Sequence, residues 1–203
     1  NELVLARDLC SRTPDWALVG CRRANECLIH WTYFTHIGEF PKKNPEGKPP
    51  HISTLLEEIE EFIPHQTYAT FFSINAQGRP GAHFDKDRLD DFAAKEHHVL
   101  PVITMLKAAY LDVMKEDLIL EGIQYSDAEM EENIRDYVHS QVELSGIDPT
   151  TSQRQNVDDE IIADVNTALD AAEELGIDFN PNEWLELGFI ARMGGRLDTA
   201  IKY

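Results

Sequence analysis

The sequence predicts a mostly α-helical protein. A helical domain over residues 1–150, with room for one short hairpin, leads into a capping helix and a further helical hairpin over residues 151–203. Apolar residues recur at steps of three and four over most of the 203 residues, and helix-start signals precede several of these segments. Only one stretch has the composition of a strand. The hydrophobic fraction of 42% is that of a globular protein with a real core.

The first long helix is predicted to run from Pro14 to about Phe34. Thr13 before Pro14 is typical of an N-cap followed by proline in the first turn. Small and apolar residues then recur along one face that we expect to be tightly packed: Trp16, Gly20, Ala24, Cys27, Trp31 and Phe34. The prolines of residues 41–50 predict an exposed linker after it, because no regular element tolerates that density of proline.

A short helix and the strand-like stretch follow the linker. Thr54 and Glu57 have the spacing of a capping box, and Pro64 is expected to end the helix. Its apolar face is predicted to hold Leu55, Leu56, Ile59, Phe62 and Ile63. Residues 68–74 are rich in aromatic and β-branched side chains, so we expect either a small hairpin or an extended segment packed on helices.

Three further helices are predicted between residues 99 and 176. The first spans about 99–120 and is expected to bury Val102, Leu106, Ala109, Tyr110, Val113 and Met114. Ser126 and Glu129 form a capping box for the second, whose expected buried face is Met130, Ile134, Tyr137, Val138 and Gln141. The third carries Ile161, Ile162, Val165, Leu169, Ala172 and Leu175, and Gly176 is expected to end it. The polar residues 148–156 are the predicted domain boundary.

The last segment begins with a strong helix start and continues with a regular set of large and small residues. Asn180, Pro181 and Glu183 supply a cap, a proline in the first turn and an acid at the third position. The residues that follow are Trp184, Leu187, Gly188, Gly195, Ala200 and Tyr203. This spacing resembles the tetratricopeptide repeat, which packs two helices through a W-x₂-L-G signature and a small-residue turn. The resemblance covers residues 184–203 only.

The resemblance implies a protein that binds other proteins. Repeats of this family stack into arrays whose concave groove holds a peptide or helix of a partner. The chain departs from the pattern because it stops inside the second helix of the repeat, and one repeat cannot bury its own apolar face. We therefore expect either further repeats after Tyr203 or docking of this hairpin on the preceding helices. Self-association through the uncovered face is a third expectation.

Charge and cysteine content narrow the choice of partner and compartment. The formal charge is −19, and residues 112–203 hold 22 of the 37 acidic residues but 6 of the 18 basic ones. An acidic surface repels phosphate, so we expect no nucleic acid and a partner of basic character. There is no apolar stretch of about 18 residues, so no membrane is expected. The odd number of cysteines, Cys10, Cys21 and Cys27, predicts free thiols in a reducing cytoplasm.

Two enzyme interpretations stand beside the scaffold. His83 and Asp85, followed by Asp87, have a spacing used for iron or zinc, but no further ligand is identifiable, so no metal or other cofactor is expected. Arg23 and His30 resemble the Arg-x₄₋₆-His motif of HEPN ribonucleases, all-α domains that cut RNA as dimers. That resemblance implies catalysis by these two residues, although no basic patch accompanies them.

Cys27 and His30 lie one turn apart and could form a thiol–imidazole pair. The commoner outcome for such a cysteine is core packing, which we expect here. The sequence as a whole favours a protein-interaction scaffold over an enzyme.

Overall fold

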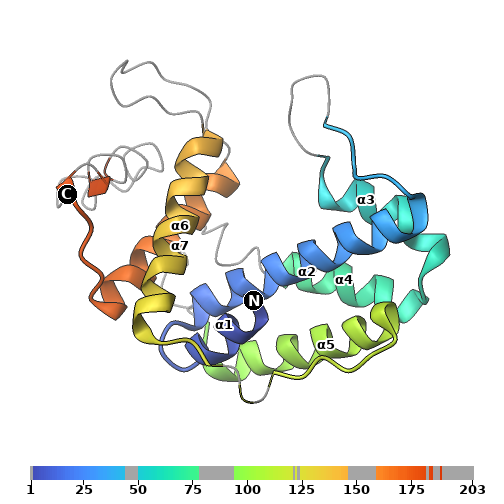
Figure 1. The fold of residues 1–203 in the computed structure, drawn as a ribbon, viewed down its shortest axis with the longest axis horizontal. Coiled ribbons are helices and arrows are strands. Elements are labelled where there is room, and N and C mark those ends of the chain that lie inside the picture. Colours follow the sequence, from blue (N-terminus) through green and yellow to red (C-terminus); the bar gives the residue numbers. More distant parts are fainter. Residues whose placement is uncertain are drawn as a thin grey trace.

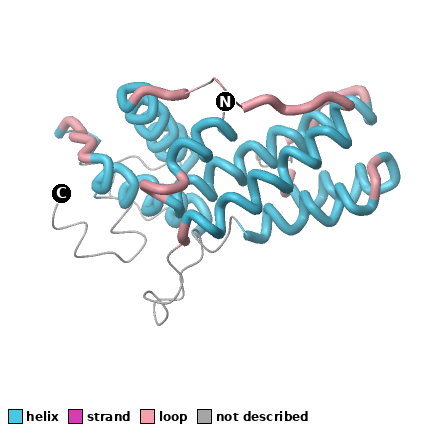
Figure 2. The backbone as a smooth tube through the Cα atoms, turned by 90° about the horizontal axis from the view of Figure 1, so that it is seen from below, coloured by secondary structure: helices cyan, strands magenta, loops and turns pink. Residues whose placement is uncertain are grey.

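The computed structural model describes residues 2–43, 50–77, 94–145 except 121 and 123, and 159–188 except 182 and 185–187, with side chains placed outside 141–145 and 159–164. Within these ranges the protein has seven α-helices, one 3₁₀ turn and no strand (Figure 2). The predicted mostly α fold is therefore confirmed. None of the helices described is long and apolar enough to cross a membrane.

The helices follow one another in a simple order. They are α1 (Glu2–Leu9), α2 (Pro14–Ile37), α3 (Ile52–Ile59), the 3₁₀ turn η1 (Glu60–Phe62), α4 (His65–Gln77), α5 (Glu96–Met114), α6 (Asp127–Ser145) and α7 (Asp159–Leu175). The long helix α2 runs through the middle of the molecule, and α5 packs on it along the lower edge of the view (Figure 1). α6 and α7 stand side by side at one end, and α3 lies at the opposite end (Figure 1).

Two clusters of buried apolar side chains hold these helices together. The larger cluster joins α1, the first half of α2, Ile74 near the end of α4, the first half of α5, α6 and α7. The smaller cluster joins the second half of α2 to α3, α4 and the last turns of α5. Because α2 and α5 contribute side chains to both clusters, the two clusters are joined through these helices. Val165, Ala168 and Leu169 of α7 belong to the larger cluster. This cluster therefore combines side chains that precede residues 148–156 in the sequence with side chains that follow them.

The strand-like stretch 68–74 is helical, so both alternatives predicted for it, a small hairpin and an extended segment, are wrong. It lies inside α4, where Thr67, Phe71 and Ile74 are buried. These positions are separated by four and three residues, which is the period of a helix. Aromatic and β-branched composition favours a strand only weakly, because packing against neighbours overrides it. In α4 that neighbour is α2, where the buried Asn25 side chain donates to the carbonyl of Phe71 at 3.0 Å.

Helix-end predictions had mixed outcomes. The Ser126–Glu129 capping box forms, with Ser126 N–H donating to the Glu129 carboxylate at 2.8 Å, and Gly176 ends α7 at a φ of 72°. Thr54 is wrong as a cap, because α3 begins two residues earlier after His51. Thr13 occupies the N-cap position of α2, yet its hydroxyl makes no capping hydrogen bond.

Predicted apolar faces were more accurate than helix ends. Val102, Leu106 and Ala109 are buried on α5, which ends at Met114 rather than 120. On α6 the predicted residues Met130, Ile134, Tyr137 and Val138 are buried, and on α7 so are Val165, Leu169 and Ala172. The side chains of Gln141, Ile161 and Ile162 lie outside the described ones.

Candidate functional site

A helix starts at Asn180 as the sequence predicts, and its first turn is capped in both directions. The Asn180 side-chain oxygen accepts the N–H of Glu183 at 3.1 Å, and the Glu183 carboxylate accepts the N–H of Asn180 at 2.6 Å. This reciprocal pair satisfies two backbone donors that a helix end leaves open. Trp184 packs edge-on against Phe179, with ring centroids 5.0 Å apart. The first large residue of the repeat-like segment is therefore anchored to the chain just before it.

Glu183 also ties this helix start to α6. The Glu183 residue is only 8% exposed, and its carboxylate receives Arg135 Nη1 at 2.9 Å and His139 Nε2 at 3.0 Å. Arg135 also donates to the Asp178 carbonyl and lies over the Phe179 ring at 4.9 Å. Desolvation alone would raise the pKa of Glu183. The Asn180 N–H, the His139 hydrogen bond and the positive charge of Arg135 outweigh it, so that pKa is lowered.

The outer face of α6 beside this network forms an open groove lined by three acidic and two basic side chains and one alanine. Its volume is about 410 Å³, and its lining residues are Ala128, Glu131, Glu132, Arg135, Asp136 and His139. Arg135 is committed to Glu131 at 2.8 Å and to Glu183. Glu132 and Asp136 are one helical turn apart and exposed. The exposed carboxylates of the groove could therefore bind a positively charged side chain of a partner.

The remaining residues of the repeat signature are only partly described. Gly188 is helical and half-buried. Leu187, Gly195, Ala200 and Tyr203 lie outside the described residues. The tetratricopeptide resemblance over 184–203 thus stays a prediction.

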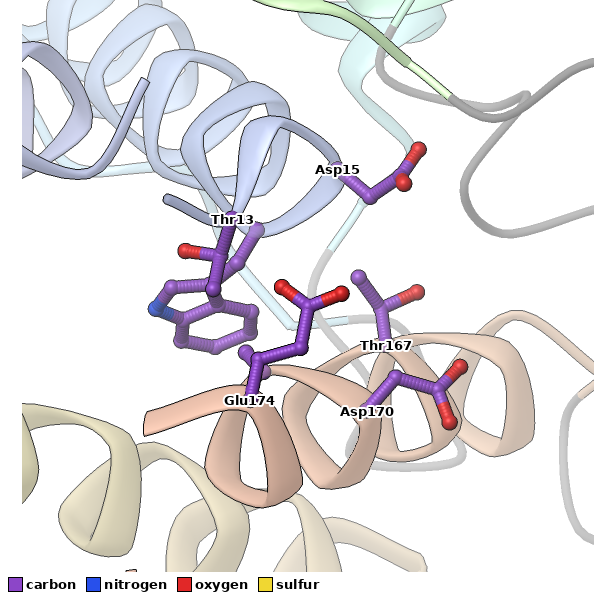
Figure 3. A pocket seen from close by; sticks show the side chains of 7 residues that line it. Thr13, Asp15, Thr167, Asp170 and Glu174 are labelled. Carbon is purple, nitrogen blue, oxygen red and sulfur yellow. The ribbon is translucent and has the colours of Figure 1, made fainter. Parts of the chain in front are cut away.

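A small cavity lies between the start of α2 and α7. It measures about 50 Å³, and Figure 3 shows its lining, which comprises Thr13, Asp15, Trp16, Thr167, Asp170, Ala171 and Glu174. The carboxylates of Asp15, Asp170 and Glu174 do not converge on one point (Figure 3). A volume of this size suits a few water molecules rather than an organic ligand, which needs roughly 300 Å³ or more.

Desolvation is the main cause of the raised pKa values of two of these carboxyls. Burial raises the pKa of Asp15, against a hydrogen bond from the Ala94 N–H at 3.0 Å that lowers it. Burial followed by the charges of Asp15 and Asp170 raises the pKa of Glu174. The carboxylates of Asp15, Asp170 and Glu174 therefore repel one another across the cavity between α2 and α7.

The residues of the alternative metal-dependent interpretation, His83 and Asp85 with Asp87, lie outside the described residues. Among the residues that are described, no group of three His, Cys, Asp or Glu side chains is placed to hold a metal ion. His98 caps the start of α5, where its Nδ1 accepts the backbone N–H of Lys95 at 3.1 Å.

Arg23 and His30 lie two turns apart on α2. Arg23 pairs with Glu2 at 2.8 Å and stacks over the Tyr137 ring at 4.5 Å, so its guanidinium serves the contact of α2 with α1 and α6. Burial lowers the pKa of His30. The ribonuclease interpretation stays a prediction, with Arg23 already engaged in packing.

The expected core position of Cys27 is wrong. Cys10 and Cys21 are buried, but Cys27 is exposed, and all three thiols are free. Desolvation by nearby side chains, followed by the charge of Glu2, raises the pKa of the Cys27 thiol. A raised pKa disfavours the thiolate, which is the reactive form.

Trp31 and Phe34 were also expected on the buried face of α2, and the structure turns them outward. Trp31 is 49% exposed and Phe34 is half-buried, whereas Leu28, Ile29, Thr32 and Tyr33 form the buried face of this half of the helix. Both sets have helical spacing, so periodicity alone could not choose between them. The signal that could have found this surface is the run of aromatic residues that continues past the helix to Phe40.

Comparison with protein-family models, with curated proteins and with solved structures finds no match to this chain. The fold class therefore rests on the structure itself.

Proposed function

We propose that the chain is a protein-interaction scaffold in which the helices from α6 onward hold a protein or peptide partner. The observation that carries the proposal is the locking of the Asn180 helix start onto α6 through Glu183, Arg135 and His139. α7 runs back along α6 (Figure 1), and a helical turn capped by Asn180 follows the end of α7 at Leu175. Successive helices packed side by side are how tetratricopeptide arrays are built, so the helix start at Asn180 is compatible with the TPR-like segment that we propose from the sequence of residues 184–203.

The groove on α6 favours a partner with lysine or arginine side chains. Glu132 and Asp136 are exposed there, and residues 112–203 carry most of the excess negative charge. Complementary charge speeds encounter and excludes acidic competitors. A cytoplasmic protein or peptide with a basic segment is the partner that fits this proposal.

The test uses charge reversal on the outside of α6. The full chain and its Glu132→Lys/Asp136→Lys variant would be cross-linked to partners in extracts of the cells that make the protein, and the retained proteins quantified. Both side chains point to solvent, so the fold is expected to survive, which circular dichroism checks. We expect the variant to lose about tenfold or more of a specific partner.

The matched control is Glu116→Lys/Asp117→Lys. It makes the same change in net charge after the end of α5, away from the α6 groove. Equal loss in both variants would show non-specific charge binding and contradict the proposal. So would RNA cleavage by the purified chain that is abolished in His30→Ala, or zinc or iron bound at unit stoichiometry and lost in His83→Ala.

A further inference from the structure

The last turns of α2 expose a set of apolar side chains far from α6. Trp31 is 49% exposed, Ile37 38% and Phe40 64%. The Phe34 ring connects them, with its centroid 6.2 Å from that of Trp31 and 4.5 Å from that of Phe40, against which it stacks. Ile37 follows Phe34 by three positions and so lies on the same side of the helix. We define Trp31, Phe34, Ile37 and Phe40 as the aromatic surface.

Carboxylates border the aromatic surface. Glu58 of α3 accepts the hydroxyl of Tyr33 at 2.9 Å, and Tyr33 precedes Ile37 by one helical turn. Glu61 follows Glu58 by three positions, and Glu39 lies in the chain just before Phe40. The charges of Glu58 and Glu39 both reach Tyr33, where a hydrogen bond to Glu58 is the first cause of its raised pKa.

This border has no lysine or arginine on its α3 side, whereas two lysines lie beside its Phe40 end. Residues 49–78 contain four glutamates and no lysine or arginine. Lys42 pairs with Glu39 at 2.9 Å, and Lys43 is its neighbour. Beyond these, Phe62 of η1 stacks on His36 with centroids 5.3 Å apart, which closes the gap between α3 and the end of α2. The result is an apolar surface with an acidic side toward α3.

We propose that the aromatic surface is a second docking site, and that its occupant is a short peptide segment with arginine or lysine next to an aliphatic or aromatic anchor. The anchor would cover Phe34, Ile37 and Phe40. One cationic side chain of the peptide could pair with Glu58 on the α3 side, and a guanidinium at another position could stack on the exposed Trp31 ring. The site lies at the α3 end of the molecule, away from the α6 groove, so it goes beyond the proposed function of α6 and α7 (Figure 1).

Other occupants fit this surface less well. A second copy meeting it across a two-fold axis would place the same glutamates opposite one another. Phosphate-bearing nucleic acids and anionic lipid surfaces would face the same carboxylates. Only a basic peptide satisfies both the apolar rings and the acidic border.

The experiment selects peptides against the full chain. A phage-displayed library of random short peptides would be panned on the wild-type protein, with counter-selection on Trp31→Ala/Phe40→Ala. Recovered peptides would be synthesised, labelled and measured by fluorescence anisotropy. We expect sequences that combine Arg or Lys with aromatic or aliphatic residues, and a Kd that rises about tenfold or more in the double variant.

Two variants identify the source of the effect. Glu58→Gln/Glu61→Gln is expected to weaken binding by about threefold to tenfold and to flatten its dependence on salt. Phe72→Ala removes an equally exposed phenylalanine (55% exposed) on α4 and is expected to change nothing. Peptides that lose binding in Glu132→Lys/Asp136→Lys instead would occupy the α6 groove, which would support the first proposal and overturn this one.

Three further outcomes would overturn the proposal. They are the absence of enrichment, enrichment of neutral or acidic peptides, and peptides that bind the wild type and Trp31→Ala/Phe40→Ala equally. A dimer in light scattering that dissociates in Trp31→Ala/Phe40→Ala would also do so, because it would assign the surface to a second copy.

Discussion

Gly20 sets how closely α1 and α2 approach. A Cβ atom at this position would lie 3.3 Å from the Cβ of Ala6 and 3.4 Å from the carbonyl oxygen of Glu2. The first contact is tighter than side chains normally make, and Ala6 is itself fully buried. A small residue is therefore required here by packing, as the sequence pattern suggested.

Replacing Gly20 tests that approach. Gly20→Val is expected to destabilise the protein by about 1–3 kcal/mol, because the branched side chain must push α1 away. Gly20→Ala should be near neutral, since alanine's better helix propensity, worth about 1 kcal/mol, offsets the close contact. Urea unfolding followed by circular dichroism measures both. A valine variant as stable as wild type would show that α1 and α2 are not this close, and Thr35→Val on the exposed face of α2 is the control.

Glu183 illustrates how one side chain can fix a helix end. Glu183→Gln keeps its shape but loses the charge that Arg135 and His139 contact. We expect a local loss of about 1–2 kcal/mol, measured as faster amide hydrogen exchange in peptides covering residues 178–188. Because its folded pKa is lowered, its contribution is present above the unfolded pKa of about 4.3 and is lost as pH falls through the folded value. If amide exchange is unchanged in Glu183→Gln, or changes equally in the control Glu132→Gln, then Glu183 does not hold this helix end on α6.

At the scale of elements, α2 shows what periodicity can and cannot predict. Its existence, start and length were predicted closely, because the apolar spacing and Thr13–Pro14 are local signals. Its buried face was predicted correctly at Trp16 and Gly20 and wrongly at Trp31. The reason is that its first half packs on α1, α6, α7 and the first half of α5, whereas its second half packs on α3, α4 and the last turns of α5. Different helices cover different faces of the two halves of α2. A single apolar face drawn along the whole helix therefore could not predict that the aromatic surface is exposed.

Polar contacts also divide into local pairs, which the sequence predicts, and distant pairs, which it does not. The capping pairs at Ser126 and Asn180 were predictable, since both partners lie within three residues. The ties of Glu183 to Arg135 and His139 join residues more than forty positions apart. No local pattern encodes such a pair, because it depends on how α6 and the last helix come together.

The contact of α2 with α7 should depend on pH through Asp15 and Glu174. Both pKa values are raised, chiefly by desolvation, so their stabilising contribution is complete below the unfolded values near pH 4 and is lost as pH rises through the folded values. Glu174→Gln removes one repelling charge. Because Glu174 is exposed, we expect a gain of only about 0.2–0.5 kcal/mol at neutral pH, vanishing near pH 4.

Thermal melts at several pH values measure this effect. Glu57→Gln, an exposed carboxylate on α3, is the control and should show no such gain. A Glu174→Gln variant that is less stable than wild type at neutral pH would mean that its charge is stabilising, contrary to the geometry of the cavity.

At the scale of the whole molecule, α2 and α5 make the two cores interdependent. Trp16 and Val19 of α2 lie in the larger cluster and Ile29 in the smaller one, while α5 divides between Leu106 and Ala109 in the same manner. Opening either core would leave half of both helices without partners. A helix stripped of its packing is marginal in water. We therefore expect the two cores to unfold together.

Ile59→Ala tests this coupling. Ile59 is fully buried in the smaller cluster, so its truncation is expected to cost about 2–4 kcal/mol. Trp16 reports on the larger cluster in a Trp31→Phe/Trp184→Phe background, and Trp31 reports on the other end in a Trp16→Phe/Trp184→Phe background. If the cores are coupled, Ile59→Ala lowers the urea midpoint of both reporters equally within each background. A shift confined to Trp31 would mean that the α3 end opens alone, and a basic peptide on the aromatic surface would then stabilise that end without strengthening the α6 end.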